Sequence, residues 1–259
     1  MFDEINTIWL IGGTSESVAI AKEIATAELS LIITVTSESA RSLYPSGLEI
    51  HVGSLNRQQM EYFCREKRIS KIVDASHPFA AEVSQNAIAI ATTFNLPYLR
   101  YQRPSLQLAE NANSSSLVTV LDSFQTLLKG SYLQNQRVLL TIGCKALPLF
   151  ESWQKHAVLF ARVLPNTESL QIALNSGFTS DRLIALRPPL TAELEMALWQ
   201  QWDISTVVTK ASGKAGGEDI KQQVAARLKI PLIIIARPQV FYPQQTDSIN
   251  KVMAFCRSK

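Results

Sequence analysis

Short apolar runs alternate with amphipathic stretches along nearly the whole chain. In its first part, continuous apolar runs lie at residues 8–11, 31–35, 71–74 and 97–100. The stretches between them carry apolar residues at helical spacing, over residues 17–27, 57–67 and 80–93. Continuous apolar runs of this length, separated by helices, are typical of buried parallel strands and not of half-exposed ones.

A polar interruption divides this pattern into two halves. Residues 102–116 contain Pro104 and end in three serines, which predicts a linker. Beyond it the apolar runs resume at residues 138–141, 158–163, 183–186, 206–209 and 232–236. The chain is therefore expected to be an α/β protein of two Rossmann-like domains, whose mostly parallel sheets face each other across a cleft. Residues 1–103 would bind a dinucleotide, and residues 104–259 would complete the cofactor and substrate cleft.

Six of the predicted strands end on, or just before, a basic residue. These residues are Arg100, Lys145, Arg162, Arg187, Lys210 and Arg237. The carboxyl ends of parallel strands meet at one edge of a sheet, where open α/β folds bind their ligands. A single cation there is usually an ordinary surface charge, but the repetition indicates a small ligand with several negative charges.

Composition narrows the class of protein. With 259 residues, 46% of them hydrophobic and 18% charged, the chain has the makeup of a compact globular protein. The net charge is only +3 and no run of like charges occurs, so nucleic acid is not an expected partner. No window is apolar enough for a membrane span, and the first residues do not read as a secretion signal.

The cysteines and histidines are too scattered for a disulfide framework or a metal site. Cys64, Cys144 and Cys256 stand far apart, as do the three histidines. We therefore expect no metal and a cytoplasmic location.

The first strand is followed by a turn that suits phosphate binding. Gly12 and Gly13 lead into a helix that carries Thr14, Ser15 and Ser17 near its start. Glycines let the backbone approach a pyrophosphate, and the helix N-terminus attracts the anion. The pattern GGTSES is not the full G-x-G-x-x-G fingerprint, so a Gly-Gly turn with a serine cap and no ligand is the alternative.

The end of the second strand bears on the choice between NADPH and NADH. No carboxylate stands directly at the strand tip, and Ser37 with Arg41 would suit a 2′-phosphate. Glu38 keeps NADH open. The sequence favours NADPH.

A second glycine-rich turn follows the strand over residues 206–208. It carries Lys210, Ser212, Gly213, Gly216 and Gly217, and it opens a helix over residues 219–228. A lysine, a serine and three glycines at such a junction suit an anion. A flexible, capped loop without a ligand is the alternative.

A histidine follows the third strand of the first half. Asp74 ends that strand, Ser76 is placed to cap the next helix, and His77 is expected over the carboxyl edge of the sheet. The charge of histidine changes near neutral pH, so His77 is a candidate proton donor or anion ligand. A purely structural histidine that holds the loop is equally compatible with the sequence.

Taken together, these segments resemble the precorrin-6A reductase family of corrin-ring biosynthesis. The matching blocks are strand-GGT, D-A-S-H-P-F-A over residues 74–80, R-Y-x-R-P, TIGCK, ARVLP, ALRPP, TKASG with its following Gly-Gly, and ARP. They run in family order across nearly the whole chain. Ala211 is a mild departure, since many relatives carry an acidic or amide residue there.

The resemblance implies an NAD(P)H-dependent reduction of one carbon–carbon double bond in precorrin-6A or its cobalt form. The substrate would carry many ionised acetate and propionate groups, for which Arg and Lys are suitable partners. The expected cofactor residues are Gly12, Gly13, Thr14, Ser15, Ser37, Arg41, Ser76, Ser212, Gly213, Gly216 and Gly217. The expected substrate residues are Arg100, Lys145, Arg162 and Arg187. His77 and Lys210 are the candidate catalytic acids.

Two other functions remain compatible with the residues alone. A two-domain transferase acting on sugar nucleotides would also need a cleft and anion-binding turns, and a non-catalytic binder of an anionic ligand would use the same cations. Neither accounts for the D-A-S-H-P-F-A block.

Overall fold

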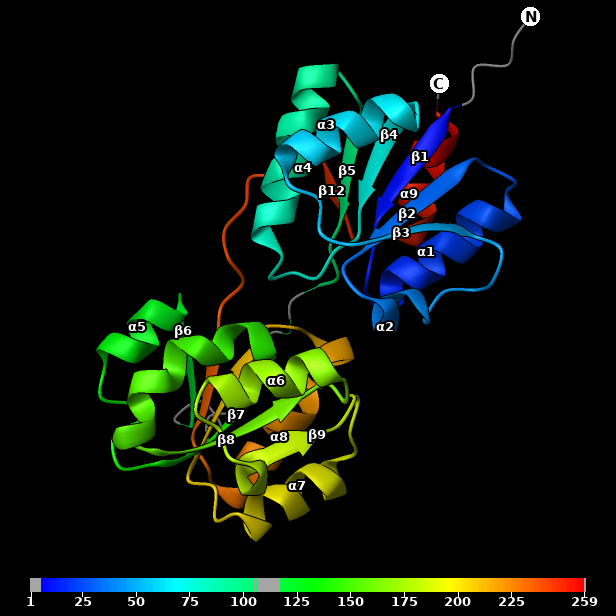
Figure 1. Ribbon diagram of the computed structural model, residues 1–259. Coiled ribbons are helices and arrows are strands. Elements are labelled where there is room, and N and C mark those ends of the chain that lie inside the picture. The colour runs from blue at the N-terminus through cyan, green and yellow to red at the C-terminus, as the bar shows by residue number, and fades with distance from the viewer. Residues whose placement is uncertain (1–5, 105, 107–116, 259) are drawn as a thin grey trace, which may run out of the picture. The chain divides into compact units, whose positions relative to one another are not determined.

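The computed structural model describes residues 6–104, 106 and 117–258, so most of the expected linker over residues 102–116 lies outside the described residues. The chain forms two compact units (Figure 1). Unit 1 comprises Met1–Pro104 together with Pro238–Lys259, and unit 2 comprises Ser105–Arg237. The sequence placed all of residues 104–259 in one domain, whereas the structure returns the C-terminal segment to unit 1.

Unit 1 is built on a six-stranded sheet in which all the paired strands are parallel, in the order β12-β5-β4-β1-β2-β3. The strands are β1 (Thr7–Ile11), β2 (Leu31–Val35), β3 (Glu49–Val52), β4 (Ile69–Asp74), β5 (Tyr98–Tyr101) and β12 (Gln245–Thr246). From β1 the chain winds outward through β2 and β3, then crosses to the other side of β1 and adds β4 and β5. The strand order reverses between β1 and β4, which is where open α/β sheets bind ligands.

Helices cover both faces of this sheet (Figure 1). Ile8 and Leu10 of β1 share a buried cluster with α1 (Ser15–Thr26) and α9 (Ile249–Arg257). Trp9 and Ile11, which point to the opposite face, share another with α3 (Arg57–Glu66) and α4 (Ala81–Phe94). Burial on both faces is why the strand is continuously apolar in sequence.

The returning C-terminal segment is held to unit 1 by its side chains and by one lysine. Val252, Met253 and Cys256 of α9 are buried in the same cluster as α1. The ammonium group of Lys71, a buried residue of β4, donates to the carbonyls of Phe255 and Ser258. These are the orphan carbonyls at a helix C-terminus, where a cation is favourable.

Unit 2 repeats the architecture with the order β6-β11-β10-β7-β8-β9, again with every pair parallel. The strands are β6 (Val118–Leu121), β7 (Arg137–Thr141), β8 (Val158–Val163), β9 (Leu183–Ala185), β10 (Thr206–Lys210) and β11 (Leu232–Ile235). The helical elements are α5 (Phe124–Lys129), η1 (Cys144–Lys155), α6 (Thr167–Asn175), η2 (Ser180–Arg182), α7 (Ala192–Gln201), η3 (Lys214–Gly216) and α8 (Glu218–Leu228). Its strand order reverses between β7 and β10.

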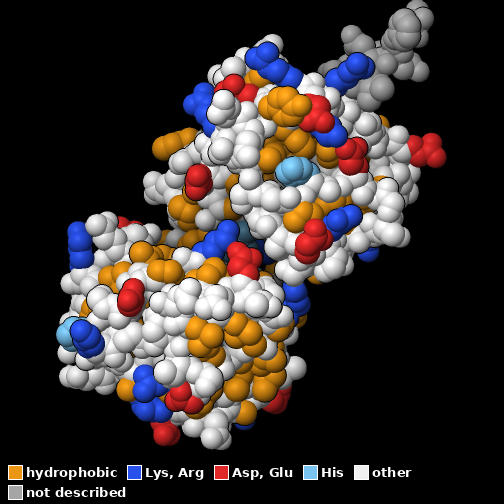
Figure 2. Space-filling model, viewed as in Figure 1, with side chains coloured by type: hydrophobic (Ala, Val, Ile, Leu, Met, Phe, Trp, Pro, Cys, Tyr) orange, Lys and Arg blue, Asp and Glu red, His pale blue; other side chains and the backbone are white. Residues whose placement is uncertain are grey.

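The expected fold class is therefore confirmed: an α/β chain with two parallel, Rossmann-like sheets. No described helix is both long and apolar enough to cross a membrane. On the visible face of each unit, basic and acidic side chains are intermixed and no large area of one sign occurs (Figure 2).

Candidate functional site

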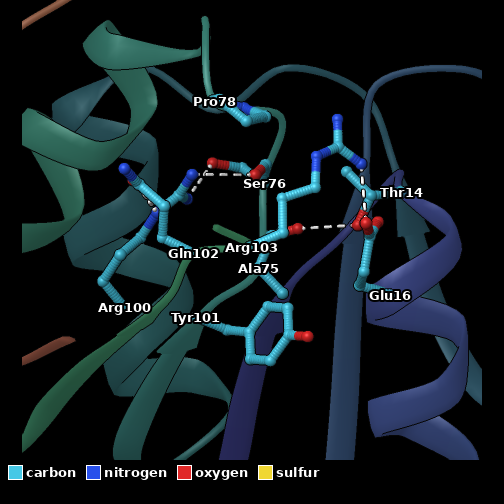
Figure 3. A pocket seen from close by; sticks show the side chains of 9 residues that line it. All are labelled: Thr14, Glu16, Ala75, Ser76, Pro78, Arg100, Tyr101, Gln102 and Arg103. Atoms are coloured by element: carbon cyan, nitrogen blue, oxygen red, sulfur yellow. Dashed lines mark hydrogen bonds and ion pairs between the residues drawn. The ribbon is translucent and has the colours of Figure 1, made fainter. Parts of the chain in front are cut away.

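A pocket opens at the switch point of unit 1, between the ends of β1 and β4 (Figure 3). Three segments contribute its lining, which consists of Thr14, Glu16, Ala75, Ser76, Pro78, Arg100, Tyr101, Gln102 and Arg103. The glycine turn after β1, the D-A-S-H-P-F-A block after β4 and the R-Y-x-R-P block of β5 thus meet at one place.

Asp74 organises the base of this pocket. Its carboxylate is fully buried and accepts hydrogen bonds from the backbone N–H of Ser76 at 3.0 Å, the hydroxyls of Ser84 at 2.6 Å and Tyr98 at 2.7 Å, and the guanidinium of Arg100 at 2.7 Å. Burial, followed by the neighbouring Asp74 carboxylate, raises the pKa of Tyr98, so its hydroxyl stays protonated and donates. Four donors on one buried carboxylate fix the start of the β4–α4 loop.

Arg100 was expected to face the substrate, and in the structure it lines the pocket while buried in an ion pair. Its side chain is only 1% exposed, because the guanidinium pairs with Asp74 and also donates to the Ser76 hydroxyl at 2.8 Å and the Ser76 carbonyl at 3.0 Å. Arg100 therefore holds the loop that lines the pocket, and Ser76 is buried by these same contacts.

The two glycines of the first turn have different roles. A Cβ on Gly12 would lie 2.2 Å from the Tyr44 hydroxyl, which accepts the Gly13 N–H at 2.8 Å and contacts the Ser17 hydroxyl at 2.6 Å. Gly12 is thus required by Tyr44, an internal contact. Gly13 has a φ of +98° and open space where a Cβ would stand, so the backbone at Gly13 is the part that a ligand can approach.

Thr14 links the glycine turn to the β4–α4 loop. As the N-cap of α1, its side chain accepts the Ser17 N–H at 3.1 Å, and the Ser17 hydroxyl accepts the Thr14 N–H at 3.0 Å in return. The Thr14 hydroxyl also donates to the Ala75 carbonyl at 2.9 Å. The helix start is therefore fixed against the loop that Asp74 organises.

An ion pair lies at the first turn of α1 (Figure 3). The Glu16 carboxylate accepts from the Arg103 guanidinium at 2.6 Å through one oxygen and from the Ser15 hydroxyl at 3.0 Å through the other. The two charged side chains are 19% and 13% exposed. Burial alone would raise the pKa of Glu16, but Arg103, the residue's own N–H and Ser15 together hold this pKa below its usual value.

Ser37 and Arg41 lie at the end of β2, the strand next to β1. Ser37 caps the short helix α2 (Glu38–Arg41), with its hydroxyl accepting the Ala40 N–H at 3.3 Å. Arg41 is 55% exposed and pairs loosely with Glu38 at 3.6 Å. An exposed pair of this kind is worth little, so Arg41 is available to a phosphate.

His77 is exposed at the tip of the β4–α4 loop. Its Nδ1 accepts the Phe79 N–H at 3.2 Å. An imidazole that accepts at Nδ1 carries its proton on Nε2. The structure is thus compatible with both interpretations of the sequence, since the ring braces the loop while the residue itself is exposed.

Lys210 lies at the switch point of unit 2. It ends β10, which pairs with β7 through Thr209 and Thr141, and the TIGCK turn that follows β7 carries Cys144 and Lys145. The Lys210 ammonium lies 5.7 Å from the centre of the Phe124 ring. Burial lowers the pKa of Lys210 to about 8, with Cys144 opposing the shift and Lys145 adding to it.

The glycine loop after Lys210 is not the open anion site that the sequence suggested. The Gly213 N–H donates to the Glu218 carboxylate at 2.7 Å, the Gly216 N–H to the Gly213 carbonyl at 3.0 Å, and the Gly217 N–H to the Lys214 carbonyl at 2.8 Å. All three glycine N–H groups are therefore committed within the loop.

The same loop is tightly packed. Ser212 is buried, and a Cβ on Gly216 would lie 1.9 Å from its hydroxyl. The buried ammonium of Lys221 donates to the carbonyls of Gly216 at 2.9 Å and Gly217 at 3.0 Å. Glycine is therefore required at position 216, where any side chain would collide with Ser212.

Arg162 is a second expected substrate residue with an ionic partner inside the fold. It is buried and pairs with Glu195 at 2.5 Å. Glu195 also accepts from the Trp199 indole at 3.1 Å and lies 3.9 Å from the Lys221 ammonium. Arg162, near the end of β8, thus pairs with a glutamate of α7 close to a lysine of α8, and its charge is neutralised inside the fold.

Lys145 and Arg187 differ from these two, because both are exposed beyond the ends of their strands. The position of each basic residue relative to its strand distinguishes the two pairs. Arg100 and Arg162 lie inside β5 and β8, whereas Lys145 follows β7 and Arg187 follows β9. A cation within a buried strand needs an internal partner, and a cation past the strand end does not.

Several residues that shape the sites had no signal in the sequence. Tyr44 and Glu195 lie far along the chain from Gly13 and Arg162, which they contact, and their positions follow only from the fold. Glu16 and Arg103 lie within the GGTSES and R-Y-x-R-P motifs, but their ion pair spans 87 residues of sequence.

The chain resembles proteins of one family over nearly its whole length. Residues 7–257 match the family described as precorrin-6x reductase CbiJ/CobK. The cobalt-precorrin-6A reductase of Synechocystis sp. is 46% identical, with 99% of this chain and 98% of that protein covered. That of Priestia megaterium is 32% identical, with 95% and 96% covered. A solved structure of the CobK precorrin-6A reductase has a TM-score of 0.77 at 23% identity over 96% of this chain and 95% of that one, a likeness of fold.

Replacement of Asp74 by Asn tests the centre of the pocket. The change leaves Arg100 buried with no opposite charge, which costs about 3–5 kcal/mol. Hydrogen exchange of β1 and β4 peptides in rising urea should report this loss. Glu38→Gln breaks the exposed pair with Arg41 and is the control, with an expected effect within about 1 kcal/mol. Equal effects of the two substitutions would contradict the role given to Asp74.

Proposed function

Since the chain belongs to the precorrin-6x reductase CbiJ/CobK family, we propose that it reduces one carbon–carbon double bond of cobalt-precorrin-6A or precorrin-6A, with NADPH as the reductant. Family membership makes the protein an oxidoreductase of cobalamin biosynthesis. The observation that supports this most is full-length similarity to cobalt-precorrin-6A reductases, with three of the matching blocks meeting at the switch point of unit 1. It favours a reductase over both the sugar-nucleotide transferase and the non-catalytic binder.

The residues at the unit 1 switch point fit a dinucleotide. Gly13 gives an open backbone surface, and the first turn of α1 supplies N–H groups and a partial positive charge. The Ser15 hydroxyl and the Arg103 guanidinium are two further donors at that turn. A bound reduced nicotinamide would supply the hydride. The assignment of Gly12, Thr14 and Ser76 is indirect, because their contacts are internal and shape the turn.

A preference for NADPH is supported by the end of β2. Arg41 is exposed there, and Ser37 begins the short helix that presents it. A guanidinium suits a 2′-phosphate, whereas NADH binding favours a carboxylate that accepts from the ribose hydroxyls. Glu38 is also at this helix start, so the preference is one of degree.

The carboxylates of the substrate are assigned to cations of unit 2. Lys145 and Arg187 are exposed beyond β7 and β9, and Lys210 lies beside the TIGCK turn. Arginine and lysine bind carboxylates through charge-assisted hydrogen bonds. Arg100 and Arg162 are left out of this set because both are buried in ion pairs.

Reduction of the double bond also requires a proton on the neighbouring carbon. Lys210, with a pKa near 8, and the exposed His77 are the proposed sources. A cytoplasmic location is part of the proposal and is supported by three cysteines that are free thiols, two of them buried.

The function is tested by anaerobic oxidation of NADPH, followed at 340 nm, with the purified protein and cobalt-precorrin-6A or precorrin-6A. Loss of absorbance that depends on the tetrapyrrole is expected. If the tetrapyrrole and the nucleotide still bind but neither tetrapyrrole is reduced with NADPH or NADH, the protein is a non-catalytic binder and the proposal is wrong.

Replacement of Arg41 by Ala should weaken NADPH more than NADH, because only NADPH carries the 2′-phosphate. We expect the KM for NADPH to rise about tenfold and that for NADH to change less than twofold. Arg57→Ala removes a similarly exposed arginine, paired with Glu61 on α3, and is the control. A loss that is equal for both nucleotides would remove the case for NADPH at this position.

The low pKa of Lys210 predicts a pH dependence of substrate binding. The ammonium is protonated below about pH 8 and loses its charge above it, so the KM for the tetrapyrrole should rise between pH 7 and pH 9. Lys210→Met should raise the KM at pH 7 and abolish this dependence. Lys214→Met, at an exposed lysine of the same loop, should retain the wild-type profile. An unchanged profile in the Lys210 variant would refute the assignment.

A further inference from the structure

We propose that Glu16 is an internal substitute for a phosphate of the cofactor. Its carboxylate holds Arg103 and the Ser15 hydroxyl at the first turn of α1, and a bound phosphate takes over both donors. Glu16 is then a residue that sets cofactor affinity by competition, and Arg103 is a phosphate ligand. This inference rests on the proposed dinucleotide site in unit 1.

The geometry of the pair carries the proposal. Glu16 is the second residue of α1, and it lines the pocket together with Thr14 and Ser76 (Figure 3). Each of its carboxylate oxygens takes one donor, Arg103 at 2.6 Å and Ser15 at 3.0 Å. The Glu16 N–H contributes as well. These are a cation, a hydroxyl and a helix N-terminal N–H, the set of groups that phosphates use at such turns.

Because both are negatively charged, the Glu16 carboxylate and a cofactor phosphate cannot occupy this turn together. The donors around Glu16 keep its pKa low, so the side chain is ionised at neutral pH. A phosphate brought to the same turn meets a like charge until the glutamate moves away. With 19% of its side chain exposed, Glu16 already borders solvent and has a path out of the site.

A purely structural role makes a different prediction. An acidic residue in the first turn stabilises a helix through the macrodipole, so its loss would weaken the fold and everything bound to it. Competition instead predicts that removal of the carboxylate tightens cofactor binding. A gain in affinity has no explanation in the structural role.

The test is equilibrium titration of the full-length protein with NADPH, followed by nucleotide fluorescence in the absence of tetrapyrrole. Glu16→Gln should lower the Kd for NADPH about threefold to tenfold relative to wild type. Arg103→Gln should raise it about tenfold. Glu23→Gln removes the same charge from an exposed position of the same helix, about 10 Å farther along, and should leave the Kd unchanged. Glu16→Ser, which also suits a first turn, replaces the glutamine variant if that variant melts at a lower temperature.

The outcomes separate this inference from the function on which it rests. If wild type binds NADPH and the Glu16 variants bind it equally or more weakly, the competition is overturned while the cofactor site stands. Equal tightening by Glu23→Gln would likewise overturn it, because a general charge effect would then suffice. Absence of NADPH and NADH binding by the wild type would overturn the proposed cofactor and this inference together.

Discussion

The buried ion pair between Asp74 and Arg100 is the constraint on which the candidate site depends. A carboxylate and a guanidinium at 0% and 1% exposure are tolerable only when both are saturated with partners, and here the partners are the site itself. The Asp74 carboxylate accepts the Ser76 N–H, and the Arg100 guanidinium donates to the Ser76 carbonyl and hydroxyl. The loop fixed in this way presents the Ala75 carbonyl, which accepts from the Thr14 hydroxyl. The end of β4, the end of β5 and the start of α1 are thereby placed relative to one another without any ligand.

Each of the two glycine turns leads into a helix that carries a hydrogen-bonded glutamate in its first turn. In unit 2 this arrangement is closed, since Glu218 is buried on the Gly213 N–H and Lys221 holds the carbonyls beyond it. In unit 1 it is open, since Glu16 borders solvent and Gly13 has free space beside it. In unit 2 the glutamate therefore helps to fix the loop that follows Lys210. In unit 1 the glutamate leaves a turn that can accept an anion.

The sequence predicted the fold well because burial on both faces of a parallel sheet leaves continuous apolar runs, such as residues 8–11 and 232–236. It missed β3 and β6, most of whose residues are not fully buried. It also missed β12, which has two residues and joins β5 from the far end of the chain. Among site residues, the exposed Lys145 and Arg187 were recognisable by their place after a strand. The fates of Arg100 and Arg162 were not, because Asp74 and Glu195 reach them only through the folded sheet. The contact of Tyr44 with Gly12 was invisible for the same reason.

The central claim is that the first turn of α1 in unit 1 binds the phosphates of the reductant. A crystal structure of the protein with NADPH tests it most directly. The account predicts the pyrophosphate beside Gly13 and Ser15, with the Arg103 guanidinium on a phosphate and the Glu16 carboxylate displaced from it. A dinucleotide bound instead at the Gly213–Gly217 turn of unit 2, with the Glu16–Arg103 pair intact, would contradict it.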